Sequence, residues 1–170
     1  MYENVVLVGF MGSGKSSVGR IVARALEGRF VDTDRLVIDH TGSEITDIFA
    51  SHGEAFFRRE EARALQSLIG QQGLVVATGG GIVTVEENFH VLKKLGFVVW
   101  LTASEEVLWD RVSRNRQRPL LHTDDPRATV RSLLEVRNPM YEAVADLKID
   151  TSILTHTEVA EKISAQVRTA

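Results

Sequence analysis

Short apolar runs alternate along this chain with longer stretches in which apolar and polar positions recur at a helical period. The apolar runs, several of them rich in β-branched residues, predict strands over 5–8, a short segment ending at 30–31, 74–77, 97–101 and 147–150. Strands that are apolar along their whole length are typical of a parallel sheet buried on both faces. We therefore expect an α/β fold, a sheet covered by helices on both sides, as one domain over 1–170.

Apolar residues at intervals of three or four predict the helices between these strands. We expect helices after 9–16, near 35–40, from 45 to a break near Gly53, over 54–71 and 86–95, after Ser104, from Pro126 onward, and after a capping box of Thr155 and Glu158. In the stretch 54–71 the expected buried positions are Ala62, Leu65, Leu68 and Ile69. We expect Pro139 to interrupt the helix that begins at Pro126.

A glycine-rich segment lies between the first strand and the first helix. Residues 9–16 read GFMGSGKS and match G-x-x-x-x-G-K-[ST], the phosphate-binding loop of nucleotide-binding enzymes. Glycines let successive backbone N–H groups face one centre, toward which the positive end of the next helix also points. Lys15 is expected to reach the β- and γ-phosphates, and the Ser16 hydroxyl to bind Mg²⁺. The alternative is a glycine turn that precedes a helix by chance, but the full spacing favours a nucleoside triphosphate site.

Further polar and glycine residues follow the second and third strands, at the edge where ligands bind in open α/β sheets. Asp32 and Asp34 come after the second strand, where one carboxylate suits Mg²⁺ and the other a substrate hydroxyl. Their alternative roles are local, a helix cap for Asp34 and a turn for Asp32. Gly79, Gly80 and Gly81 follow the third strand and indicate close approach of the backbone to a ligand, with a flexible surface turn as the alternative.

Composition narrows the classes of partner. The net charge is −3 and the sequence pI about 6.0, which gives no electrostatic reason to expect a nucleic acid or an anionic membrane. The chain has no cysteine, which excludes disulfides and thiolate catalysis, and its histidines form no metal-ligand pattern. No apolar run approaches the roughly 20 residues of a membrane helix, and the first strand begins too close to Met1 for a targeting peptide. We expect a cytoplasmic protein.

These segments, together with three arginine-containing motifs, resemble the shikimate kinase family over nearly the whole chain. Each arginine alone would more often be a surface residue, but here the motifs occur in the order of the family. They are the loop at 9–16, D-T-D at 32–34, F-R-R-E-E at 57–61, G-G-G at 79–81, R-P-L-L at 118–121 and R-N-P-M-Y at 137–141. Many enzymes share the phosphate-binding loop, whereas the combination is specific.

The resemblance implies a three-layer α/β/α P-loop kinase fold, similar to that of nucleoside-monophosphate kinases. This fold has a central five-stranded parallel sheet, a substrate-binding region, here at about 33–61, and a lid, here at about 113–126. The implied reaction is ATP-dependent phosphorylation of the 3-hydroxyl of shikimate, which gives shikimate 3-phosphate and ADP on the chorismate route to aromatic amino acids. ATP and shikimate are then the partners, Mg²⁺ is the cofactor, and we expect a monomer.

The resemblance also assigns the residues that bind the substrate. Arg58, rather than Arg59, and Arg137 match the positions that bind the carboxylate, for which a forked guanidinium is better suited than a lysine ammonium. Asp34 matches the position that accepts the substrate hydroxyl and can take its proton, with help from the backbone of 79–81.

For the nucleotide, the resemblance implies contacts from the loop and from two later arginines. The expected ATP-binding residues are Gly12, Ser13, Gly14, Lys15, Ser16, Ser17, Arg111 and Arg118. Arg111 matches a position that stacks on adenine, and Arg118 a lid position that covers the phosphates, with a surface pair to Asp124 or Asp125 as its alternative. The expected catalytic residues are Lys15, Asp34 and Arg118, and the expected metal ligands are Ser16 and, through water, Asp32.

Two other functions compete with this interpretation. Another small-metabolite kinase of the same fold, acting on gluconate or a nucleoside monophosphate, would explain the loop and the lid but not the combined D-T-D, G-G-G and spaced arginines. A nucleotide-binding regulatory module without catalysis predicts loss of Lys15, Asp34 or Arg118, and all three are present. Release of ADP in the presence of each acceptor distinguishes these functions.

Overall fold

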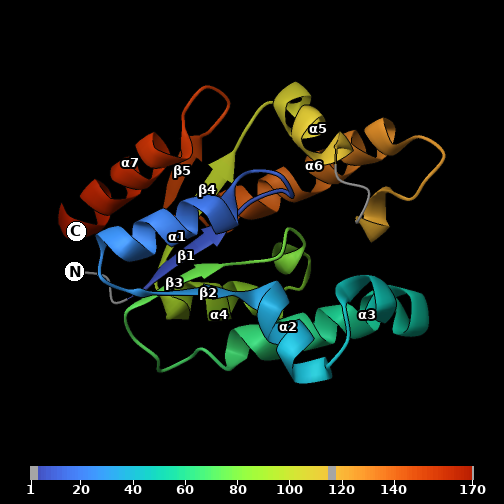
Figure 1. Ribbon diagram of the computed structural model, residues 1–170, viewed down its shortest axis with the longest axis horizontal. Helices are drawn as coiled ribbons and strands as arrows, with labels where there is room; N and C mark the ends of the chain where they lie inside the picture. The colour runs from blue at the N-terminus through green and yellow to red at the C-terminus, as the bar shows by residue number, and fades with distance from the viewer. Residues whose placement is uncertain (1–3, 115–117, 170) are drawn as a thin grey trace.

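A sheet of five parallel strands forms the centre of the molecule (Figure 1). The computed structural model describes residues 4–114 and 118–169. The strands lie in the order β2-β3-β1-β4-β5, with the bounds β1 Val5–Val8, β2 Arg29–Asp32, β3 Leu74–Ala77, β4 Phe97–Thr102 and β5 Leu147–Asp150. Every residue of β1 and β3 is buried, which explains their uninterrupted apolar sequence. The predicted five-stranded parallel sheet is confirmed.

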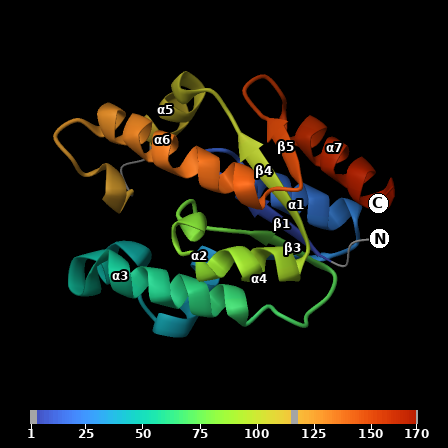
Figure 2. The same ribbon diagram turned by 180° about the vertical axis from the view of Figure 1, so that it is seen from behind.

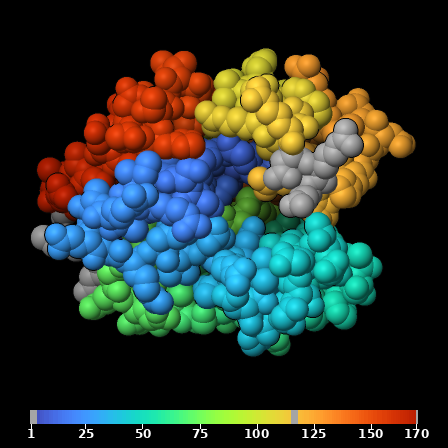
Figure 3. Space-filling view, in the orientation of Figure 1, coloured from blue at the N-terminus to red at the C-terminus, as the bar shows by residue number. Residues whose placement is uncertain are grey.

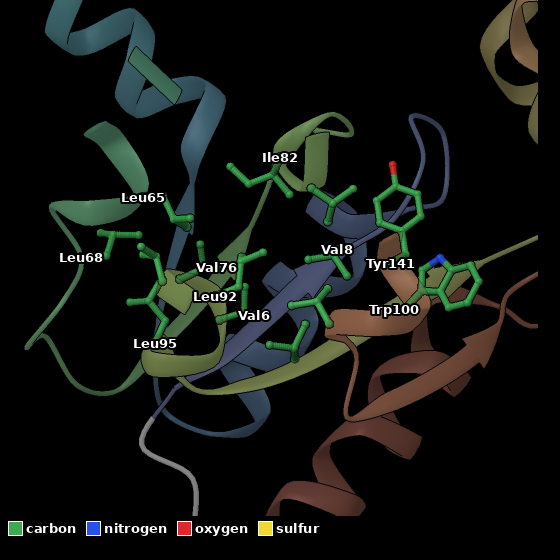
Figure 4. Close-up of a cluster of buried hydrophobic side chains, with 14 of the residues drawn as sticks. Val6, Val8, Leu65, Leu68, Val76, Ile82, Leu92, Leu95, Trp100 and Tyr141 are labelled. Atoms are coloured by element: carbon green, nitrogen blue, oxygen red, sulfur yellow. The ribbon is translucent and has the colours of Figure 1, made fainter. Parts of the chain in front are cut away.

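Helices cover both faces of this sheet (Figures 1 and 2). Their bounds are α1 Lys15–Ala25, α2 Thr33–Thr41, α3 Ile45–Gln66, α4 Glu87–Leu95, α5 Glu105–Ser113, α6 Pro126–Val144 and α7 His156–Thr169, with short 3₁₀ helices η1 Ile82–Thr84 and η2 Pro119–Leu121. An apolar core joins α1 and α7 to one face, and a second core joins α3, α4 and α6 to the other. Figure 4 shows the second core, which includes Trp100 and Tyr141. The expected three-layer arrangement is confirmed. Within the described ranges, none of the helices has the length and apolar content to cross a membrane.

Side chains that the sequence suggested as helix caps make the expected hydrogen bonds. Ser104 Oγ accepts a hydrogen bond from the backbone N–H three residues later at 3.3 Å, and Asp125 Oδ1 accepts the equivalent bond at 3.0 Å. Thr155 and Glu158 form the capping box, because the Thr155 N–H donates to Glu158 Oε2 at 2.7 Å and the Glu158 N–H donates to Thr155 Oγ1 at 3.2 Å. These local signals fix where α5, α6 and α7 begin.

The helix α3 bends at Gly53, whose φ of 78° lies in the left-handed region. The predicted break near this glycine is confirmed. The helix ends before the predicted boundary at 71, and its expected buried positions are only partly right. Leu65 and Leu68 are buried, but Ala62 is half-buried and Ile69 is 37% exposed. Burial of Ile69 was a wrong prediction, because the helical period does not continue through the turn that follows α3.

The helix α6 continues through Pro139 to Val144, although we expected the proline to interrupt it. The missing N–H of Pro139 removes one helical hydrogen bond, to the carbonyl of Glu135. Both residues are exposed, so water can satisfy that carbonyl, while Leu134 and Tyr141 on the other face are buried. Packing of the buried face outweighs the local cost of the proline, and the predicted interruption was wrong.

Asn4 joins three segments at the amino ends of the strands. Its buried side chain donates from Nδ2 to the carbonyl oxygens of Gln71 and Leu95, each at 2.8 Å. Its Oδ1 accepts a hydrogen bond from the N–H of Leu74 at 2.8 Å. The chain entering β3 and the end of α4 are therefore tied to the start of β1.

We expect Asn4→Ala to lower the free energy of unfolding by about 2–4 kcal/mol, because three backbone groups lose their partner at once. Urea unfolding followed by circular dichroism measures this change. The control is Gln72→Ala, which removes an exposed amide side chain from the loop before β3 and should change stability by less than about 0.5 kcal/mol. Equal, small effects of the two substitutions would contradict the role given to Asn4.

Candidate active site

The carboxyl ends of β1, β2 and β3 open into two adjoining pockets. The first lies over the glycine-rich loop and the beginning of α1, and the second lies between α3, α6 and the backbone of 79–81. Both pockets are lined by Met11, Asp34, Gly79, Gly80 and Arg118. Figure 3 shows this region as a hollow between the α2–α3 segment and the part of the molecule that contains α5 and α6.

The loop between β1 and α1 has a backbone that favours glycine. Gly12 and Gly14 have φ values of 78° and 93°. A Cβ on Gly9 would lie 2.3 Å from the carbonyl oxygen of Leu101. The helix α1 begins at Lys15, so its unpaired N–H groups and the positive end of its dipole lie at the first pocket. This local structure is suited to bind phosphate.

Lys15 is almost completely buried beside the first pocket. Its ammonium donates hydrogen bonds to the carbonyl oxygens of Gly9 at 2.8 Å and Phe10 at 2.9 Å. Burial lowers the pKa of Lys15 to about 8, the Asp34 carboxylate opposes this effect, and the Arg118 guanidinium adds to it. A poorly hydrated cation beside another cation favours the arrival of an anion such as a phosphate group.

Ser16 and Asp32 meet at the start of α1 and the end of β2. Ser16 Oγ donates to Asp32 Oδ2 at 2.8 Å, while Asp32 Oδ1 accepts from the Asp34 N–H at 3.0 Å and caps α2. The helix cap is therefore Asp32 and not Asp34. Hydroxyl and carboxylate oxygens are ligands that Mg²⁺ prefers, and Mg²⁺ usually completes its shell with water and substrate phosphates. In the described part of the chain, no cluster of three His, Cys, Asp or Glu could hold a metal alone. The pair fits a Mg²⁺ ion shared with a nucleotide.

Two carboxylates, the half-buried Asp34 and the buried Glu61, face the backbone of Gly79. A Cβ added to Gly79 would lie 2.1 Å from Glu61 Oε1 and 2.9 Å from Asp34 Oδ1. Neither oxygen has a hydrogen-bond partner among the described residues. Burial raises the pKa of Asp34, and the Asp32 carboxylate raises it further. Burial also raises the pKa of Glu61 to about 6, against the opposing effect of Arg58. Two acceptors therefore face the site where a ligand hydroxyl can donate.

The guanidinium group of Arg58 lies against Gly81. Its Nη1 donates to Glu61 Oε2 at 2.8 Å, and its Nε and Nη2 donate to Glu54 Oε1 at 3.2 and 3.0 Å. A Cβ on Gly81 would lie 2.3 Å from the guanidinium carbon of Arg58 and from both of its terminal nitrogens. Arg58 lines the second pocket, whereas Arg59 is exposed. The choice of Arg58 over Arg59 as the residue that faces the pocket agrees with this geometry.

Two more guanidinium groups line the second pocket. Arg137, on α6, is 3% exposed, and Arg118 follows α5 and is half-buried. Arg137 Nη1 and Arg118 Nε are buried and have no hydrogen-bond partner within 4–114 and 118–169. Arg118 also acts electrostatically on Lys15 and Asp34, which a purely superficial pair with Asp124 or Asp125 would not do. Part of the expected lid, 115–117, lies outside the described residues.

Most of the predicted nucleotide-binding residues meet at the first pocket. It is lined by Gly12, Gly14, Lys15, Ser16, Ser17, Arg111 and Arg118. Ser13 is 1% exposed and does not line this pocket, so its contact with the nucleotide stays a prediction. The Arg111 guanidinium donates to the carbonyl oxygens of Gly12 at 3.2 Å and Thr151 at 3.0 Å, and thus braces the loop. Stacking of Arg111 on adenine stays a prediction.

Several lining residues were not predicted from the sequence. Glu61 was given no role, although its spacing of three residues from Arg58 on a helix is the signal for a side-chain pair. His156, at the start of α7, lines the first pocket without belonging to any recognisable motif. The apolar part of the second pocket comes from Met11, Ile45, Phe49, Phe57, Pro119 and Leu120, of which the phenylalanines and Ile45 look like ordinary core residues in the sequence.

Comparison with known proteins points to one family. The family model described as shikimate kinase matches residues 11–168. The shikimate kinase of Thermodesulfovibrio yellowstonii is 45% identical over 161 residues, which cover 95% of this chain and 92% of that protein. That of Vibrio parahaemolyticus is 43% identical over 161 residues, which cover 95% of this chain and 94% of that protein.

Solved structures give the same result. The shikimate kinase of Acinetobacter baumannii, determined in complex with shikimate, matches with a TM-score of 0.94 at 38% identity, covering 98% of this chain and 93% of that chain. The shikimate kinase of Aquifex aeolicus matches with a TM-score of 0.85 at 33% identity, covering 97% and 96% of the two chains. Sequence and fold therefore agree over almost the full length, and this chain belongs to the shikimate kinase family.

Proposed function

We propose that this chain transfers the γ-phosphoryl group of ATP to the 3-hydroxyl of shikimate and releases shikimate 3-phosphate and ADP, on the chorismate route to aromatic amino acids. The observation that carries this proposal is the second pocket, which joins the phosphate-binding loop and contains two separately held guanidinium groups beside two carboxylates. The family of the chain and the shikimate complex of the Acinetobacter baumannii relative support the same substrate.

Arg58 and Arg137 bind the shikimate carboxylate in this proposal. Arg58 is already oriented by Glu61 and Glu54, and the buried Nη1 of Arg137 has no hydrogen-bond partner in the part of the chain that the structure describes. Two planar guanidinium groups can bind a carboxylate with directed hydrogen bonds, which a lysine ammonium does not provide. The backbone of 79–81 lines the pocket between them and can approach the ring of the substrate closely.

The nucleotide occupies the first pocket, where the backbone of 12–14, Lys15, Ser17, Arg111 and Arg118 contact it. Ser16 and, through water, Asp32 hold Mg²⁺, which supplies charge neutralisation on the phosphates when it is bound. The hydrogen bond between Ser16 and Asp32 keeps both oxygen ligands at one place before the metal arrives.

Asp34 orients the 3-hydroxyl and receives its proton as the hydroxyl oxygen bonds to the γ-phosphorus and the β-phosphate oxygen of ADP departs. The raised pKa of Asp34 in this buried site favours proton uptake by its carboxylate. Lys15 and Arg118 offset the negative charge on the transferring group, which is the main way in which enzymes accelerate phosphoryl transfer.

The proposal also includes the division of the chain into regions and the movement of the lid. The substrate-binding region is about 33–61 and the lid about 113–126 of a single domain. Closure of the lid brings Arg118 over the phosphates. A monomeric state and a cytoplasmic location stay predictions from the sequence.

A coupled assay of ADP release tests the proposed function. We expect turnover when shikimate is added with ATP and Mg²⁺, and only background ATP hydrolysis with gluconate or nucleoside monophosphates. Turnover with one of those acceptors but not with shikimate would favour a different small-metabolite kinase. Tight ATP binding without turnover of any acceptor would favour a regulatory module.

We expect Arg118→Ala to lower kcat by about 10²–10³-fold, somewhat less than the loss typical of an arginine that stabilises phosphoryl transfer, because Lys15 and Mg²⁺ share the charge. The affinity for shikimate should change little. The matched control is Arg114→Ala, because Arg114 is exposed and pairs with Asp110 in the same region. A kcat for Arg118→Ala within about fivefold of wild type, which is roughly 1 kcal/mol on the barrier, would remove Arg118 from the reaction.

A further inference from the structure

Tyr141 is a buried polar group beside the site that the proposed reaction does not use. It lies four residues after Arg137 on α6, so that the two side chains share one face of the helix. Its ring is fully buried and packs on Trp100, with ring centroids 5.8 Å apart and an interplanar angle of 32°. Figure 4 shows the ring among apolar side chains, with its oxygen pointing away from Trp100.

The phenol oxygen connects two parts of the second pocket. Its O–H donates a hydrogen bond to the carbonyl oxygen of Gly80, and the Arg137 guanidinium lies near enough to lower its pKa. A tyrosine hydroxyl can donate one bond and accept others, so that the oxygen can still accept a bond from this guanidinium. Burial raises the pKa of Tyr141 to about 12, against the effect of Arg137, and the group therefore remains a donor at neutral pH.

Arg137 has few other polar contacts that would fix it. None of the ion pairs among the described residues includes Arg137, and the ring of Phe10 lies as far as 6.0 Å from its guanidinium carbon. An arginine side chain loses rotamer entropy when it is held in one position. A neighbour that already orients the guanidinium removes part of this cost from the binding step.

We propose that Tyr141 is a positioning residue, whose hydroxyl holds the Arg137 guanidinium and the Gly80 carbonyl in one fixed arrangement. This leaves Arg137 Nη1, which lies 3.7 Å from the place a Gly80 Cβ would occupy and has no hydrogen-bond partner among the described residues, able to bind a carboxylate in the second pocket. The inference rests on the proposed function, because shikimate is the ligand whose carboxylate Arg137 would bind. Tyr141 acts through Arg137 and does not itself touch the reacting atoms.

The experiment compares Tyr141→Phe with wild type by calorimetric titration of shikimate and of ATP, together with steady-state kinetics. Loss of a hydrogen bond to a charged group should weaken the binding of shikimate about tenfold or more. The affinity for ATP and the kcat at saturating shikimate should remain within about threefold of wild type, since the nucleotide pocket and the reacting groups are untouched. Unchanged shikimate affinity in Tyr141→Phe would overturn the inference.

Two further variants separate positioning from packing and from the proposed function. Trp100→Phe reduces the apolar contact with the Tyr141 ring but removes no hydrogen bond in the site, so it should lower thermal stability without a selective loss of shikimate affinity. In an Arg137→Lys background, Tyr141→Phe should weaken shikimate binding by less than about twofold, because the two act as one unit. If Tyr141→Phe weakens shikimate binding in this background as much as it does in wild type, Tyr141 does not act through Arg137. If wild type does not bind shikimate, the proposed function itself fails and the inference fails with it. If wild type binds shikimate and Tyr141→Phe binds it equally well, the inference alone fails.

Discussion

The backbone from Gly79 to Gly81 passes so close to side chains of α2 and α3 that no Cβ fits at either end of it. At Gly79 a Cβ would meet the carboxylates of Glu61 and Asp34, and at Gly81 it would meet the whole guanidinium group of Arg58. The arrangement of the second pocket depends on this close approach. This backbone follows directly from β3, an interior strand of the sheet, and the flexible charged side chains pack against it.

The site beside this backbone segment holds many charges out of water. The buried or half-buried cations are Lys15, Arg58, Arg118 and Arg137, and the carboxylates among them are Asp32, Asp34 and Glu61. Their desolvation has a cost, which is visible in the lowered pKa of Lys15 and the raised pKa values of Asp34 and Glu61. The two apolar cores on the faces of the sheet offset that cost away from the site. In return, charges that are oriented before the substrates arrive need no rearrangement during the reaction.

Local sequence patterns predicted most of the fold. The central strands are apolar throughout because they are buried on both faces, and the caps at Ser104 and Asp125 depend on residues within a few positions. The phosphate-binding loop was predictable for the same reason. The errors arose where tertiary packing decides the outcome. α6 continues through Pro139 because its other face is buried, and Ile69 is exposed because the chain leaves the helix before it.

The more specific the motif that contains a residue, the better the sequence predicted whether that residue lines a pocket. Nothing local distinguishes Arg58 from Arg59, and only the family motif led to the residue that lines the pocket. Glu61 orients Arg58 through a pair at a spacing of three residues, which is a local signal, whereas the proposed role of Tyr141 depends on its contact with Gly80, which is distant in sequence from α6. A sequence can indicate which charged groups are used. How each one is held depends on segments that meet only in the folded chain.

Substitution of Gly81 by alanine tests most directly whether the glycine segment positions the charged groups that we propose bind the substrate. The φ of −97° at Gly81 is compatible with alanine, so the fold should persist while the added Cβ displaces the Arg58 guanidinium. Calorimetric titration of Gly81→Ala with shikimate and with ATP is the measurement. We expect the dissociation constant for shikimate to rise about tenfold or more and that for ATP to stay within about twofold of wild type. Shikimate binding as tight as in wild type would contradict the dependence of the site on this close approach.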